Sequence, residues 1–235
     1  MMGAKDRDRV MMMQFHQSYS YEDFIEGFRP SASGFDLIKG SFYTFCKKAQ
    51  DDTDNDYFFI VDEINRGNLS KIFGELFMLI ENDKRGPNNK LQLLYSRERF
   101  YVPSNVYLIG MMNTADRSLA MLDYALRRRF AFFDLRPGFD SKGFIAYRDS
   151  LGNPKLNNLL ACTVKLNAAI SDDDTLGDGF CIGHSYFCGM KAADVTDAKL
   201  SAIVEYELAP MLREYWFDEP SKVREWTDAL RKSIK

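Results

Sequence analysis

The stretch Phe58-Phe59-Ile60-Val61-Asp62-Glu63 decides the fold class of this 235-residue chain. Its first four residues, preceded by Tyr57, form a continuously apolar run. Such a run is typical of a buried strand in a parallel sheet, because half-exposed strands alternate apolar and polar residues. Ligands of open parallel sheets gather at the carboxyl ends of the strands. We therefore expect Asp62 and Glu63 to lie at a ligand-binding edge.

A second continuously apolar run lies downstream, at residues 106–112. Between the two runs we expect a helix that Asn68 caps, with apolar residues at helical spacing at Leu69, Ile72, Phe73, Leu76 and Ile80. Strand, helix, strand is a crossover unit and predicts a parallel sheet with helices on its faces. Residues 10–15 and 130–135 are two further strand candidates.

Turn-forming residues at 83–89 precede a predicted hairpin at 91–102. Beyond Pro137 the strand character fades, and helical periodicity follows at residues 157–170 and 198–215. Pro210 argues against a straight helix in the second of these stretches. We therefore expect an α/β domain at residues 1–136 and a mostly helical domain at residues 137–235.

The composition is that of an ordinary globular protein, with 46% hydrophobic and 28% charged residues. Lys and Arg number 31 against 34 Asp and Glu, so the net charge of -3 leaves no basic footprint for binding duplex DNA. The four cysteines form no C-x-x-C pair, which predicts reduced thiols and no structural zinc. The sequence contains no apolar run of signal-peptide or membrane-spanning character, so we expect a cytoplasmic protein without membrane contact.

An apolar strand that ends in Asp62-Glu63 has the Walker B pattern. In that pattern the Asp helps to hold Mg²⁺ near phosphates, and the Glu orients or deprotonates the attacking water. The alternative is an acidic pair that caps the next helix. Asn113 follows the second strand, where a neutral amide can hold water or a γ-phosphate oxygen, the role called sensor 1; its alternative is also a helix cap.

Three consecutive arginines, Arg127, Arg128 and Arg129, lie before Phe130. Such a run is commonly a set of solvated surface charges. In ring ATPases, however, an arginine at this place stabilises transition-state charge on the γ-phosphate of the neighbouring subunit. Arg129 adjoins the apolar Phe130, so we expect it to serve the structure more than the chemistry.

Four segments together carry a resemblance to a known family: FHQSYSYEDFIEGFRP (15–30), FFIVDEINRGNLSKIFGELFMLIENDKRG (58–86), VPSNVYLIGMMNTADRSLAMLDYALRRRF (102–130) and GFCIGHSYF (179–187). They resemble the McrB family of AAA+ proteins, the motor subunits of restriction systems. The resemblance implies a hexameric ring that hydrolyses GTP, with ATP as the alternative, and uses Mg²⁺. It also implies an McrC-like nuclease partner and DNA with modified cytosine, read mainly by an N-terminal domain that this sequence lacks.

The resemblance assigns the nucleotide site to eight residues, namely Asp62, Glu63, Asn65, Asn113, Asp116, Arg117, Arg127 and Arg128. It makes Asp62 the residue that holds Mg²⁺ through water. Arg127 and Arg128 become candidates for the arginine finger. The run from Asn113 to Asp116 also matches a guanine-reading pattern, although on the expected fold it lies near the γ-phosphate. His184 and Ser185 fall where the lid could approach nucleotide; a buried, hydrogen-bonded histidine is the alternative.

The sequence departs from the family at one decisive point, because no G-x-x-x-x-G-K-[ST] run cradles the phosphates. We therefore expect an AAA+ α/β core whose N-terminal strand and Walker A loop are missing, followed by a mostly helical lid. An incomplete sheet invites association through its exposed strands. Two alternatives to a hydrolysing subunit remain: an assembly module that cannot hydrolyse nucleotide alone, and an AAA+ ATPase that remodels proteins.

Overall fold

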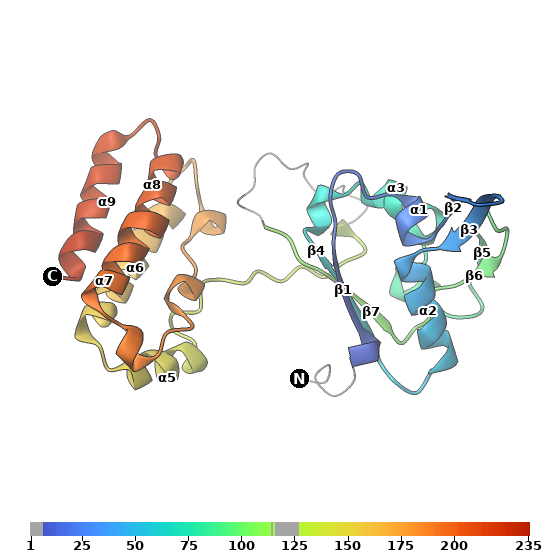
Figure 1. The fold of residues 1–235 in the computed structure, drawn as a ribbon, viewed down its shortest axis with the longest axis horizontal. Coiled ribbons are helices and arrows are strands. Elements are labelled where there is room, and N and C mark those ends of the chain that lie inside the picture. The colour runs from blue at the N-terminus through green and yellow to red at the C-terminus, as the bar shows by residue number, and fades with distance from the viewer. Residues whose placement is uncertain (1–6, 114, 116–126) are drawn as a thin grey trace. The chain divides into compact units, whose positions relative to one another are not determined.

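The three apolar runs at 10–15, 57–61 and 106–112 form one parallel sheet, as the sequence predicts. In this computed structural model, which describes residues 7–113, 115 and 127–235, the strands are β1 (Val10–Gln14), β4 (Tyr57–Asp62) and β7 (Val106–Gly110). They pair in the order β1-β4-β7, with Met12 beside Ile60 and Ile60 beside Ile109. The chain divides into two units, Met1–Phe132 and Phe133–Lys235, and the sheet lies in the first (Figure 1).

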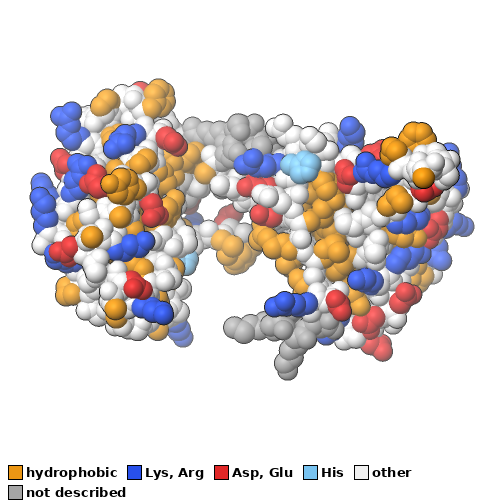
Figure 2. Space-filling model, in the orientation of Figure 1, with side chains coloured by type: hydrophobic (Ala, Val, Ile, Leu, Met, Phe, Trp, Pro, Cys, Tyr) orange, Lys and Arg blue, Asp and Glu red, His pale blue; other side chains and the backbone are white. Residues whose placement is uncertain are grey.

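One face of the sheet is packed and the other is bare. Phe59 is fully buried on the packed face, 5.1 Å between ring centres from Phe42 of α2 (Ser41–Asp51). The opposite face presents side chains that are at least one third exposed, namely Met12, Tyr107, Ile109 and Met111. Hydrophobic side chains gather on the surface over these strands (Figure 2). β4 was expected to be buried on both faces, but no element of the described chain covers the second one.

The predicted helix after Asn68 is only partly correct. Asn68 caps α3 (Leu69–Phe73) by accepting from the backbone N–H of Lys71, and the expected apolar face is buried. The α-helix ends at Gly74, where φ is 52° and the chain continues as a 3-10 turn. A Cβ at Gly74 would lie 2.9 Å from the Tyr21 ring. Close packing and a left-handed residue therefore break the helix that periodicity suggested.

The strand predicted at 130–135 is wrong. Residues 131–138 have no regular structure and pair with no described strand. Phe133 and Leu135 are 84% and 88% exposed. An apolar run predicts a strand because a buried strand needs apolar side chains. Phe133 and Leu135 are not buried against the sheet, so the inference fails here.

Two hairpins project from the sheet unit. After α1 (Tyr21–Phe24), β2 (Glu26–Ser31) and β3 (Gly34–Lys39) form an antiparallel ribbon that the sequence analysis did not anticipate. The predicted hairpin at 91–102 is present as β5 (Leu91–Gln92) and β6 (Arg99–Phe100). The two hairpins are the outlying parts of this unit (Figure 1).

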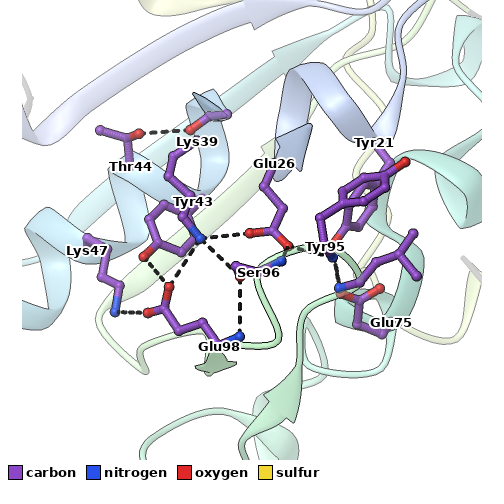
Figure 3. Close-up of polar contacts among 12 residues, drawn as sticks. Tyr21, Glu26, Lys39, Tyr43, Thr44, Lys47, Glu75, Tyr95, Ser96 and Glu98 are labelled. Carbon is purple, nitrogen blue, oxygen red and sulfur yellow. Dashed lines mark hydrogen bonds and ion pairs between the residues drawn. The ribbon is translucent and has the colours of Figure 1, made fainter. Parts of the chain in front are cut away.

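A polar network joins the two hairpins to α2 (Figure 3). Glu26 is fully buried, and its Oε1 accepts from the backbone N–H groups of Tyr95 and Ser96 at 2.9 and 2.8 Å. Its Oε2 accepts from Lys39 Nζ at 2.7 Å, and the same ammonium lies 3.1 Å from Glu98 Oε2. A buried carboxylate with three donors is satisfied, so it fixes the hairpins rather than weakening the core.

The second unit is helical, as expected from its periodicity. Its α-helices are α5 (Lys142–Leu151), α6 (Pro154–Ser171), α7 (Asp197–Ala202), α8 (Ala209–Tyr215) and α9 (Pro220–Ser233). Trp216 and Leu159 are among its buried core residues. A π-helical segment, Ile203–Leu208, joins α7 to α8 just before Pro210. Pro210 has no backbone N–H to donate, and the wider π-helical turn lets the chain continue without that hydrogen bond. The departure from a straight helix that Pro210 predicts is therefore present.

No described helix is both long and apolar enough to cross a membrane. The four cysteines are free thiols. Cys46 is fully buried in the sheet unit, and burial raises the pKa of its thiol above the ordinary value.

Candidate functional site

The carboxyl edge of the sheet extends beyond the strands themselves. Phe15, directly after β1, donates its backbone N–H to Asp62 O at 2.9 Å. On the other side, Met111 N–H donates to Val61 O at 2.8 Å, and Ile64 N–H donates to Met111 O at 2.9 Å. The Asp62-Glu63-Ile64 turn is therefore held by the segments that follow β1 and β7, which fixes the backbone of the two acidic residues.

Glu63 has a strained backbone. Its φ of 50° and ψ of 44° lie in the left-handed region, which residues with a Cβ seldom occupy and which costs about 1–3 kcal/mol. The Glu63 N–H donates to Asp62 Oδ1 at 3.0 Å, so the two acidic residues stabilise this turn together. Gly110 makes room for it, because a Cβ there would lie 2.6 Å from Ile64 Cδ1. Strain of this kind persists where the surrounding structure fixes a functional side chain.

Two acceptor oxygens at this turn are buried and lack a hydrogen-bond donor. They are Glu63 Oε2 and Asn65 Oδ1. Glu63 Oε2 forms an ion pair with Arg66 Nε at 3.1 Å, although without hydrogen-bond geometry. Unpaired buried acceptors cost free energy, so a site that keeps two of them is suited to a donor from outside the chain, such as water or a metal-bound water.

The carboxylate oxygens at the turn are of the kind that Mg²⁺ takes as ligands. Asp62 Oδ1 accepts from Glu63 N–H, whereas its second oxygen has no partner within the described residues. Mg²⁺ in phosphate-binding sites takes one or two carboxylates and keeps several waters, so Asp62 can hold it through a water. The described residues contain no group of three or more His, Cys, Asp or Glu that would form a protein-only metal cage.

Asn113 lies three residues beyond the end of β7, which pairs alongside β4. Its side chain is exposed, and Oδ1 accepts from Ala115 N–H at 3.1 Å. This bond has the spacing of an Asx turn, and it leaves the amide N–H groups available as donors. Asp116 and Arg117, the other predicted residues of this segment, lie outside the described residues.

The three arginines separate into two kinds. Arg127 and Arg128 are exposed. A side chain that acts on a neighbouring subunit has to be exposed in the single chain. Arg129 instead pairs with Glu81 at 2.8 Å and lies over the Phe77 ring, 4.4 Å from its centre. Its side chain is 17% exposed. The structural role predicted for Arg129 agrees with these contacts.

His184 is held in the lid unit. Its Nδ1 accepts from Gly138 N–H at 2.9 Å, and its ring meets Phe144 edge-on. The hydrogen-bonded alternative is therefore the one that the structure supports.

The sequence analysis did not identify Arg66 as part of the site. Arg66 follows Glu63 by three residues in a short helix, and that spacing could have revealed the ion pair.

Two family models match the chain. The AAA domain (dynein-related subfamily) matches residues 2–130, which contain the turn at Asp62 and Glu63. The chain belongs to the AAA domain family. The McrB alpha-helical lid domain matches residues 158–224 of the second unit. The predicted fold class, an AAA+ α/β core followed by a helical lid, is thereby confirmed.

Curated relatives place this AAA domain with McrB. It is 53% identical over 239 residues to the Type IV methyl-directed restriction enzyme EcoKMcrB subunit of Escherichia coli K12, covering 97% of this chain and 51% of that protein. It is 28% identical over 127 residues to the Type II restriction enzyme BsuMI component YdiS of Bacillus subtilis 168, covering 49% and 37%. The chain spans about half or less of the relatives it matches. The McrB resemblance is confirmed.

A solved structure from Cytophaga hutchinsonii aligns with 91% of this AAA chain and 53% of its own chain. The sequence identity is 12% and the TM-score is 0.35. An overlap at that score carries no weight for fold or function.

Proposed function

We propose that the chain is the Walker B, sensor and lid part of a nucleotide-hydrolysing AAA+ motor subunit in a restriction complex that acts on DNA with modified cytosine. One observation carries the proposal. The sheet edge holds Glu63 in a strained turn, next to Asp62, with a buried carboxylate oxygen that accepts no hydrogen bond. Asn113 follows β7, the strand that pairs with β4. The printed restriction functions of the two relatives supply the biological setting.

The residues divide the chemistry of phosphoanhydride hydrolysis. Asp62 would hold Mg²⁺ through a water, and the ion would neutralise phosphate charge. Glu63 accepts a proton from the attacking water, and Asn113 donates hydrogen bonds to that water or to the γ-phosphate. Asn65, Asp116 and Arg117 complete the nucleotide contacts in this proposal. GTP is the expected nucleotide and ATP the alternative.

The phosphate cradle is supplied by a segment outside this sequence. Two features of the sheet support this step. β7 pairs only with β4 among the described strands, and the face that carries Met12 and Ile109 is bare. Parallel sheets are normally covered on both faces, so a further strand, phosphate loop and helix fit this edge and this face.

A hexameric ring and an McrC-like nuclease are the partners that the proposal requires. Arg127 or Arg128 reaches the nucleotide of the adjacent subunit, while DNA with modified cytosine is recognised mainly by another domain. The second candidate is an assembly module without hydrolysis. The missing G-x-x-x-x-G-K-[ST] run favours it for the isolated chain.

Nucleotide titration separates the two candidates. A fluorescent GTP analogue is titrated with Mg²⁺ into the isolated chain and into a longer protein that includes a phosphate loop. We expect weak binding without turnover for the chain, and tight binding with turnover for the longer protein, stimulated by the nuclease partner. An ATP analogue in a parallel series decides the base preference. A longer protein that binds without turnover, even with its partner, would favour the assembly module.

A further inference from the structure

The lid unit contains a pocket of about 320 Å³ that no step of the proposed hydrolysis uses. It lies between the end of α8 and one face of α9, from Pro220 to Arg231, and both helices belong to the same unit. Its volume is within the range of small-ligand sites. The lining includes three arginines and no carboxylate.

The three arginines differ in how they are satisfied. Arg231 binds Glu205 through Nε at 2.6 Å and Nη2 at 2.7 Å, and it also pairs with Asp228. Arg213 and Arg224 form no hydrogen bond or ion pair within the described part of the chain. The pocket therefore offers two guanidinium groups whose donors are free, next to a third that is locked in place.

A buried hydroxyl in the lining also lacks a partner. Thr227 is 5% exposed, and its Oγ1 makes no hydrogen bond. Threonine in a helix commonly donates to the carbonyl four residues earlier, but Thr227 in α9 does not. An unsatisfied buried hydroxyl is costly, so an acceptor oxygen bound at Thr227 would supply its missing bond.

The remaining wall is apolar. Trp216 is fixed because its indole N–H donates to Asp173 Oδ2 at 2.8 Å, while Phe217 is 79% exposed. Val223 also lines the pocket. A bare inorganic anion gains nothing from Phe217 and Val223, whereas an anion attached to an apolar or aromatic body would bury them.

We propose that this pocket binds an organic oxyanion, a phosphomonoester or carboxylate carried on an apolar or aromatic body. Arg213 and Arg224 bind the oxyanion, because the planar guanidinium matches both head groups. Thr227 donates to it, and Phe217 and Val223 contact the body. The site is independent of the hydrolysis proposal, since it uses none of those residues.

Trp216 provides the readout. The chain has two tryptophans, so Trp226→Phe leaves Trp216 as the sole emitter. Its fluorescence is followed in the full chain during titration with phenyl phosphate, phenylacetate, inorganic phosphate and benzyl alcohol. We expect saturable changes with phenyl phosphate or phenylacetate, at affinities about tenfold or more above those of inorganic phosphate and benzyl alcohol. The tighter of the two aromatic anions identifies the head group.

Variants separate a built site from general charge attraction. Arg224→Gln should weaken binding by about tenfold or more, because it removes a charge-assisted donor. Thr227→Val should weaken binding while stabilising the free chain, since it deletes an unpaired hydroxyl. The control Arg148→Gln, in α5 and paired with Asp149, should leave binding unchanged. Equal losses in Arg224→Gln and Arg148→Gln would overturn the proposal.

Calorimetry on the unaltered chain with the same probes guards against a Trp226→Phe variant that fails to fold. Binding of an aromatic anion in calorimetry supports the site. The absence of binding by the unaltered chain overturns it.

Discussion

Arg66 Nε lies 3.1 Å from Glu63 Oε2, three residues along the turn that follows β4. Among the described residues, this guanidinium forms the ion pair with a carboxylate oxygen that accepts no hydrogen bond. Within the proposed hydrolysis, Arg66 therefore acts as a positioning residue that holds Glu63 and does not itself contact the nucleotide.

Replacing Arg66 by Gln should lower turnover while leaving nucleotide affinity nearly unchanged. The loss is expected to reach about 10²-fold, because small displacements of a catalytic group have effects of that size. Arg66→Lys keeps the charge but not the planar geometry, so it should restore only part of the rate. Steady-state kinetics and nucleotide titration on a protein with its phosphate loop provide the measurement. A fall in affinity at unchanged kcat would instead make Arg66 a nucleotide ligand.

The exposed arginines should act across a subunit boundary. Arg127→Ala or Arg128→Ala is expected to cut turnover by roughly 10³ or more without loss of nucleotide affinity. Mixing such a variant with Glu63→Gln should recover partial activity, because some interfaces then pair an intact Glu63 with an intact arginine. Arg129→Ala serves as the contrast and should lower stability, since it removes the Glu81 ion pair. No recovery in mixed assemblies would argue against a finger in trans.

The polar network predicts how the sheet unit responds to acid. Burial raises the pKa of Glu98, but hydrogen bonds from Lys47, Tyr43 and Lys39 outweigh burial and lower it to about 2. A carboxyl with a depressed pKa stabilises the fold above its unfolded pKa of about 4.3. That contribution is lost as the pH falls from about 4.3 towards 2.

Comparing the unaltered chain with Glu98→Gln tests this sign. The difference in unfolding free energy should be full at pH 6 and shrink below pH 4, as measured by urea unfolding at each pH. Tyr43→Phe removes one donor to Glu98, so it should weaken the pH dependence without abolishing it. A constant difference between pH 6 and pH 3 would contradict the ionised network.

Gly40 is required where α2 begins. A Cβ there would lie 2.3 Å from the carbonyl carbon of Phe24, a backbone atom that no side-chain rotation can move. Gly40→Ala should therefore destabilise the fold by about 1–3 kcal/mol. Gly143→Ala is the matched control, because nothing lies within 4 Å of its added Cβ in α5. It should stabilise by about 0.5–1 kcal/mol. Chemical unfolding followed by circular dichroism measures both.

The sheet and its edge could be predicted because strand character and the position of Asp62 are local properties of the sequence. The continuous apolar run of β4 was also a correct sign of a parallel sheet, even though one face is bare. The interruption at Gly74 depends on the Tyr21 ring, which is distant in sequence. The failed strand at 130–135 shows that apolar residues without a partner strand do not make a sheet.

The ribbon from Glu26 to Lys39 could not be predicted for a related reason. Its anchor is Glu26, whose donors come from Tyr95 and Ser96 about seventy residues away. The residues on either side of Glu63 are likewise held by backbone hydrogen bonds to Phe15 and Met111, one on each neighbouring segment. Sequence patterns identified the carboxylates, but only tertiary contacts determine their geometry.

The central claim is that Glu63 is the base of a nucleotide-hydrolysing site whose metal is held by Asp62. The most direct measurement is single-turnover hydrolysis by Glu63→Gln, in a protein that includes the phosphate loop, with nucleotide affinity measured on the same sample. The amide keeps the shape of the side chain but cannot accept the proton, so affinity should be retained while hydrolysis is nearly abolished. Hydrolysis by Glu63→Gln at the unaltered rate would contradict the account.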